Sequence, residues 1–172
     1  MQHPLAFSST QEEAENPPVT TGLPFNKGNK PPTHSSLNVD GACKGNPGDC
    51  GGGGCIRDSK GNIQMAFSYF YGDGTSMLAE IRALCDGLKL AASTGYQLSA
   101  VYSDSQSLVN SLNDGKMISW RSYRWWREAH MLLTQQHIHF SHVFREANQL
   151  ADSLANFASP VDRLNQIDIK IS

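Results

Sequence analysis

Hydrophobic and polar residues alternate in the first half of the chain. In residues 36–40 (SLNVD), Leu37 and Val39 alternate with polar neighbours, a pattern typical of a β-strand. Residues 54–58 and 62–71 have the character of two further strands joined by the turn DSKGN, and they predict an antiparallel hairpin. Three neighbouring strands are therefore expected before any helix.

From Ser76 onward the hydrophobic residues recur with the period of a helix. Arg82, Asp86 and Lys89 fall on the opposite face, which we expect to be solvated. Gly95 has the position of a C-terminal cap, so the helix is expected to end there. The apolar stripe consists of Met77, Ile81, Leu84, Leu88 and Ala91.

In the second half of the chain, strands and helices alternate. Residues 97–105 predict a strand that is apolar on both faces, which favours a central place in a sheet. Helices are expected from about 105 to 112 and from about 119 to 136, followed by a strand at 138–144. A last helix at 147–158 carries Leu150, Leu154 and Phe157 on one side. This order predicts an α/β fold with a mixed sheet covered by helices.

The two ends of the chain differ from this central part. Residues 1–35 contain six of the eight prolines among Ser, Thr, Gln and Glu, and they offer little apolar surface to offset the entropy of ordering. We expect this segment to be a disordered leader. Residues 36–159 then form one domain, which a chain of 172 residues allows. The tail at 160–172 has alternating apolar residues near its end and no assigned role.

The composition narrows the classes of function. With 39% hydrophobic and 17% charged residues the chain is typical of a globular protein, and its net charge of -2 argues against binding nucleic acid through net charge alone. A local basic patch remains compatible with this charge. The N-terminus lacks the features of a secretory signal, and no stretch approaches the roughly 18 apolar residues of a membrane span. An intracellular protein is expected, with its four cysteines reduced because none has CxxC spacing.

Four carboxylates stand at the edges of the predicted elements. Asp40 ends the first strand, Glu80 lies at the margin of the apolar helical stripe, and Asp104 ends the central strand. Asp152 lies in the last helix, opposite its apolar side chains. Taken singly, Asp40 is typical of a turn, Asp104 of a helix cap and Asp152 of a solvated surface. Together they offer the oxygen ligands that Mg²⁺ prefers, and a pair of such ions supports phosphodiester hydrolysis.

Four motifs follow one another along the chain: VDGACKGNPGDCGGGG, AEIRAL, YSDSQSLV and HVFREANQLADSLA. In this order and at these separations they resemble the type 1 ribonuclease H family. They are most similar to the plant ribonuclease H-like domains associated with non-LTR retroelement reverse transcriptases. The resemblance covers residues 36–159 and implies a five-stranded mixed sheet, three antiparallel strands plus two parallel ones, flanked by helices. It also implies that the domain can be part of a larger reverse-transcriptase polyprotein.

The resemblance implies Mg²⁺-dependent endonucleolytic hydrolysis of the RNA strand of RNA–DNA hybrids, leaving 3′-hydroxyl and 5′-phosphate ends. The implied catalytic residues, which are also the ligands of two Mg²⁺ ions with Mn²⁺ as a substitute, are Asp40, Glu80, Asp104 and Asp152. By this analogy Asp40 bridges both ions, and Asp152 completes the site of the ion that activates the water. Glu80 and Asp104 hold the ion at the leaving 3′ oxygen.

Three further residues match family positions that touch the nucleic acid: Asn46, Thr75 and Gln106. A turn-forming role is the alternative for Asn46. We interpret the glycine-rich stretch at 41–54 as a turn that leaves room and backbone N–H donors for a nucleic-acid backbone near Asp40.

The loop before the last helix departs from the family pattern. Many relatives carry a histidine there, but the loop is shortened here to FREAN. Alternation assigns His142 to the preceding strand, so Arg145 is the stronger polar candidate, with a plain surface role as the open alternative. In residues 119–136 three arginines share one helical face, which either is solvated or contacts phosphates: Arg121, Arg124 and Arg127.

Two other functions compete with hybrid hydrolysis. The first is a retroelement remnant that binds nucleic acid but has little or no activity. It is kept open because Ser76 and Met77 stand where relatives often carry asparagines. The intact set of four carboxylates favours the enzyme. A 3′–5′ exonuclease on the same fold is the other, and the GNPG turn and the DSQ segment argue against it. We expect a monomer that binds an RNA–DNA hybrid and does not associate with a membrane.

Overall fold

The computed structural model describes residues 34–158 and 167–170. They form a mixed sheet with the strand order β5-β4-β1-β2-β3-β6. The strands are β1 (Ser35–Gly45), β2 (Gly48–Arg57), β3 (Ile63–Gly74), β4 (Leu98–Ser103), β5 (His139–His142) and β6 (Ile167–Lys170). The helices are α1 (Ser76–Thr94), α2 (Gln106–Asn113), α3 (Tyr123–Gln135) and α4 (Gln149–Phe157), with the short 3₁₀ turns η1 (Trp120–Ser122) and η2 (Arg145–Ala147).

The sheet confirms the predicted α/β class and adds one strand to it. Strands β1, β2 and β3 pair antiparallel, and β4 and β5 follow in parallel from β1. The expected count of five is corrected to six, because β6 pairs antiparallel with the outer edge of β3. Ile167 and Ile169 of the tail therefore belong to an edge strand. The expected leader at 1–35 lies outside the described residues except for its last two, and Ser35 already begins β1.

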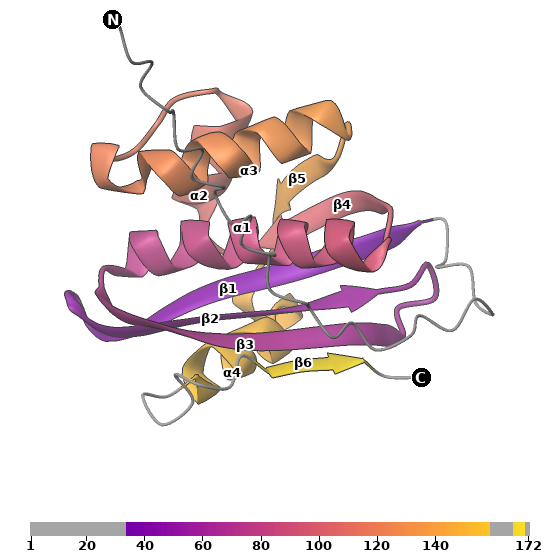
Figure 1. Cartoon of the computed structure of the whole chain (residues 1–172), viewed down its shortest axis with the longest axis horizontal. Coiled ribbons are helices and arrows are strands. Elements are labelled where there is room, and N and C mark those ends of the chain that lie inside the picture. The colour runs from indigo at the N-terminus through magenta and orange to yellow at the C-terminus, as the bar shows by residue number, and fades with distance from the viewer. Residues whose placement is uncertain (1–33, 159–166, 171–172) are drawn as a thin grey trace, which may run out of the picture. The chain divides into compact units, whose positions relative to one another are not determined.

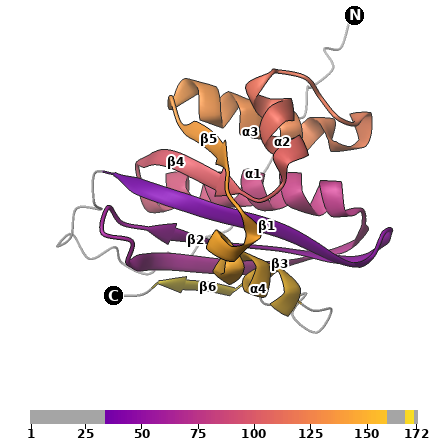
Figure 2. The same ribbon diagram turned by 180° about the vertical axis from the view of Figure 1, so that it is seen from behind.

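Helices cover both faces of the sheet. Helix α1 crosses one face, with α3 packed against it, and α4 lies on the opposite face beside β1 and β2 (Figures 1 and 2). The largest fully buried side chains come from both sheet and helices and include Leu37, Ile56, Phe67, Ile81, Leu84 and Leu108. The apolar stripe of α1 therefore faces the sheet as predicted, and Gly95 ends the helix in a left-handed conformation.

Two side chains of α1 are less solvated than the sequence pattern predicts. The guanidinium of Arg82 lies 4.1 Å from the centroid of the Tyr71 ring and 5.3 Å from that of Trp125. Asp86 accepts a hydrogen bond of 2.9 Å from the Tyr71 hydroxyl. The expectation of a fully solvated face is wrong for Arg82 and Asp86, because β3 and α3 extend past the edge of the helix and cover them.

The buried face of α4 also differs from the expected one. Phe157 is 64% exposed, whereas Ala151 and Ala155 are completely or almost completely buried. The reason lies in β2, since a Cβ atom on Gly51 would stand 2.6 Å from the carbonyl oxygen of Ala155. Glycines in the strand bring the helix so close that only alanines fit between them.

The glycines of β2 are therefore packing residues. Gly51 to Gly54 are buried inside the strand, with Gly51 and Gly53 facing α4. The interpretation of the whole stretch as an open turn beside a nucleic-acid backbone is wrong for these four positions. Only residues 46 and 47, between β1 and β2, form the turn.

The cysteines divide into a bonded pair and two thiols. Cys43 and Cys50 stand opposite each other in the β1–β2 register and are joined by a disulfide. Cys55 and Cys85 are buried and free. The expectation that all four are reduced is wrong for the first pair, because the tight hairpin at Asn46 brings together residues whose spacing in sequence gives no such sign.

Candidate metal centre

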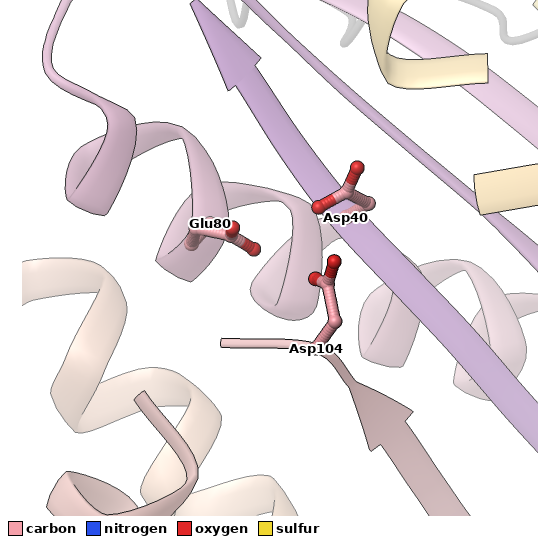
Figure 3. A group of neighbouring side chains, drawn as sticks. All are labelled: Asp40, Glu80 and Asp104. Atoms are coloured by element: carbon pink, nitrogen blue, oxygen red, sulfur yellow. The ribbon is translucent and has the colours of Figure 1, made fainter. Parts of the chain in front are cut away.

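Three of the predicted carboxylates converge where β4 ends beside the middle of β1. Oxygen atoms of Asp40, Glu80 and Asp104 all lie within 4.8 Å of one another. Figure 3 shows the three side chains pointing toward one another from β1, from α1 and from the end of β4. Strands β1 and β4 are parallel neighbours, so the residues that follow their paired segments lie side by side.

Gly41 brings the helical carboxylate to the strand. Its backbone N–H donates a 3.2 Å hydrogen bond to Oε2 of Glu80. A Cβ atom at this position would stand 2.7 Å from the carbonyl oxygen of Ala79 and closer still to the Glu80 backbone. The glycine after Asp40 thus permits the close approach of α1, and this approach places Glu80 beside Asp40.

The fourth carboxylate reaches the site from the other face of the sheet. Asp152 lies on α4, and its Oδ1 accepts hydrogen bonds from Nη2 of Arg145 at 2.7 Å and from Nδ2 of Asn156 at 3.2 Å. Its negative charge contributes to the raised pKa of Asp40, so the two carboxylates are neighbours. The structure therefore brings Asp152 to the same region, paired with an arginine and outside the group of three.

The electrostatics of the group favour a cation. Burial, followed by the charges of Asp104 and Asp152, raises the pKa of Asp40 from 3.8 to about 7. Burial, followed by the charges of Asp40 and Asp104, raises the pKa of Glu80 well above its ordinary value. The side chain of Asp40 is only 4% exposed, so water screens this repulsion poorly. Clustered carboxylate oxygens with unbalanced charge suit a hard divalent cation such as Mg²⁺.

A buried asparagine ties α4 to the strand that carries Asp40. Asn148 is 1% exposed, and its Nδ2 donates a 2.8 Å hydrogen bond to the carbonyl oxygen of Val39. Its Oδ1 accepts a 3.1 Å bond from Nδ2 of Asn38. Sequence reasoning missed the role of both residues. An asparagine just before a helix is typical of a local cap, and nothing in the spacing indicates a partner 110 residues away.

The three residues predicted to touch nucleic acid flank the carboxylates. Asn46 is exposed at the tip of the β1–β2 hairpin, and its Oδ1 accepts a 3.2 Å bond from the N–H of Ser76. The hydroxyl of Thr75 caps α1 by accepting from the N–H of Leu78. Gln106 is exposed at the start of α2, two residues after the site carboxylate of β4. Their contact with a substrate stays a prediction.

A groove adjoins the start of α1. It has a volume of about 630 Å³, and Trp120 at its wall is 77% exposed. Its lining includes Pro47, Gly74, Thr75, Leu78, Trp120 and Arg121. An exposed aromatic ring beside an arginine is a combination that stacks on bases and contacts phosphates.

The two candidates of the shortened loop occupy different places. His142 ends β5, as alternation predicts, with its ring centroid 5.7 Å from that of Phe144. Arg145 lies in η2 and reaches Asp152. Of these two residues, Arg145 is the one that forms an ion pair with a predicted ligand.

Comparisons with known proteins agree with this geometry. The family model described as reverse transcriptase-like matches residues 38–158. A candidate ribonuclease H protein of Arabidopsis thaliana is 35% identical over 123 residues, which are 71% of this chain and 20% of that protein. Ribonuclease H of Caldanaerobacter subterraneus is 32% identical over 134 residues and is covered to 85% of its length.

A solved structure has the same fold. The crystal structure of LC11-RNase H1 in complex with an RNA/DNA hybrid is 27% identical and superposes with a TM-score of 0.66, covering 72% of this chain and 95% of that one. This chain spans only a fifth of the Arabidopsis relative and most of the bacterial one. In the part of the chain that the structure describes, no helix is long and apolar enough to cross a membrane.

Proposed function

Because this chain belongs to the reverse transcriptase-like family of ribonuclease H folds, we propose that it hydrolyses the RNA strand of RNA–DNA hybrids endonucleolytically. One observation carries the proposal. Carboxylates from three separate elements converge within 4.8 Å, and burial together with the charges of neighbouring carboxylates raises the pKa of Asp40 and Glu80. A fold can hold such unbalanced charge because a bound cation neutralises it.

The proposed ligands of two Mg²⁺ ions, replaceable by Mn²⁺, are Asp40, Glu80, Asp104 and Asp152. Bound magnesium supplies Lewis acidity that activates water and stabilises a departing oxygen. Asp40 is the proposed shared ligand, because it is the most enclosed and feels the charges of Asp104 and Asp152. The bond from Gly41 fixes Oε2 of Glu80, so the helical ligand is oriented before a metal arrives.

The remaining predicted contacts position the hybrid. Asn46 and Thr75 lie at the hairpin tip and the start of α1, next to the groove that Trp120 and Arg121 line. We assign one strand of the hybrid to this groove. Gln106 lies near Asp104 and is assigned to the RNA strand at the reaction centre. The relative solved with a bound RNA/DNA hybrid supports this substrate class.

The decisive experiment uses a labelled RNA–DNA hybrid with the purified full chain and Mg²⁺. We expect cleavage of the RNA strand to fragments with 5′-phosphate ends, no cleavage of duplex DNA, and no activity in Asp104→Asn. A matched control is Asp114→Asn, which removes a negative charge from the exposed end of α2. Hybrid binding without any cut, in Mg²⁺ or Mn²⁺ at high protein concentration, favours the nucleic-acid-binding alternative. Light scattering tests the expected monomer.

A further inference from the structure

One of the proposed metal ligands, Asp152, already forms an ion pair with Arg145. Nη2 of Arg145 lies 2.7 Å from Oδ1 of Asp152, with the side chains 71% and 26% exposed. The same oxygen accepts a second bond, from Nδ2 of Asn156 at 3.2 Å. Within residues 34–158 and 167–170 this is the ion pair that involves the site, since the other ion pair joins Lys89 of α1 to Glu128 of α3.

Arg145 has a hydrogen-bonded backbone and an exposed side chain. Its carbonyl oxygen accepts a 2.9 Å hydrogen bond from the N–H of Asn148, whose side chain is buried and bonded to β1. Its guanidinium, by contrast, stands in solvent on three flexible methylenes. The charges of Asp104 and Asp40 also act on Arg145, after that of Asp152. The guanidinium can therefore move over the carboxylates without any change in the backbone.

We propose that Arg145 is an exchangeable counter-charge that competes with a metal ion for Asp152 until a substrate phosphate takes the guanidinium away. This inference rests on the proposed function and assigns a positioning role within it. A guanidinium can bind two oxygens of a phosphate through two parallel N–H donors, whereas its bond to Asp152 runs from Nη2 to Oδ1. Transfer of Arg145 to the hybrid frees Oδ1 of Asp152, so hybrid binding strengthens metal binding at this ligand. Thermodynamic linkage requires the reverse effect as well.

The expected effect is small and measurable. An exposed ion pair changes an equilibrium constant by at most roughly fivefold. Removal of the guanidinium should therefore tighten metal binding to the free protein by up to about fivefold. A residue that merely oriented Asp152 would have the opposite effect, since its removal would weaken the metal site.

The test measures Mn²⁺ binding to the full chain without nucleic acid, by the electron paramagnetic resonance signal of the free ion. We expect Arg145→Ala to bind the weaker of two Mn²⁺ ions about fivefold more tightly than the wild type, and Arg145→Lys to lie between them. The matched control is Arg57→Ala, which removes a positive charge from the end of β2. Equal or weaker Mn²⁺ binding by Arg145→Ala overturns the inference, as does an equal gain in the control.

The second readout is the cleavage reaction at saturating hybrid. Because Arg145 has then left Asp152, the Mg²⁺ concentration for half-maximal rate should differ less than twofold between the wild type and Arg145→Ala. The KM for the hybrid should rise several-fold in the variant. If the wild type cleaves normally and Arg145→Ala has the same KM for the hybrid, the transfer of Arg145 to the phosphate is refuted while the proposed function stands. A wild type that neither binds Mn²⁺ nor cleaves overturns the proposed function together with this inference.

Discussion

Asp40→Asn should make the metal-free protein more stable. The substitution keeps the shape of the side chain and removes a charge that is almost fully buried beside those of Asp104 and Asp152. The pKa of Asp40 rises from 3.8 to about 7 on folding, so at pH 8 the protein must ionise a carboxyl that the unfolded chain ionises easily. This difference in pKa between the folded and the unfolded state lowers the free energy of unfolding of the wild type.

The size of the effect follows from the shift. Each pKa unit corresponds to about 1.4 kcal/mol, so a shift of about three units destabilises the folded wild type by on the order of 4 kcal/mol above pH 7. Well below pH 3.8 the carboxyl is protonated in both states, and the effect vanishes. The gain of Asp40→Asn should therefore be small at pH 4, grow between pH 4 and 7, and be nearly complete at pH 8.

Urea unfolding in the presence of EDTA, at pH 4, 6 and 8, measures this gain. Asp114→Asn is the control, because it removes a charge from an exposed position. Added Mg²⁺ should stabilise the wild type by about 3 kcal/mol at a hundredfold excess over its Kd, and the variant much less. Equal stability of Asp40→Asn and the wild type at pH 8 without metal, or an equal gain in Asp114→Asn, would refute the reasoning.

Three further predictions concern the frame of the site. Asn148→Ala leaves the amide of Asn38 and the carbonyl of Val39 without a partner, and should lower the free energy of unfolding by about 2–3 kcal/mol in chemical denaturation. Gly41→Ala forces α1 away from β1, and calorimetry should show a loss of about 1–3 kcal/mol together with weaker Mn²⁺ binding. Asn46→Ala should raise the KM for the hybrid several-fold with kcat nearly unchanged, and a normal KM would remove Asn46 from the substrate contacts.

Much of the site could be predicted because it depends on strand order. Asp104 directly follows β4, as predicted, whereas Asp40 lies inside β1, which continues to Gly45 because β2 pairs with it beyond the predicted strand end. The two carboxylates still meet, because the parallel pairing of β1 with β4 ends just before both of them. Glu80 was predictable from its angle on the helix. These inferences use only local patterns, which the sequence displays directly.

Other features depend on contacts that local patterns do not contain. The Asn38–Asn148 bond, the disulfide across the hairpin and the cover over Arg82 each join residues brought near by the fold. The face of α4 was predicted wrongly because hydrophobicity favours leucine and phenylalanine as core residues. The glycines of β2 leave space only for alanine. Steric fit between two elements decided the outcome there, and hydrophobicity did not.

The glycine opposite Asp40 in the β1–β2 register has a consequence for how the site can evolve. Gly53 faces Asp40 across the strands, and the backbone of Leu154 and Ala155 in α4 lies directly on it. The separation between Asp40 and Asp152 is thus fixed by main-chain atoms in van der Waals contact. Substitutions elsewhere in the core can change stability while the separation between Asp40 and Asp152 stays the same. A single methyl group at Gly53 would push α4 away and increase that separation.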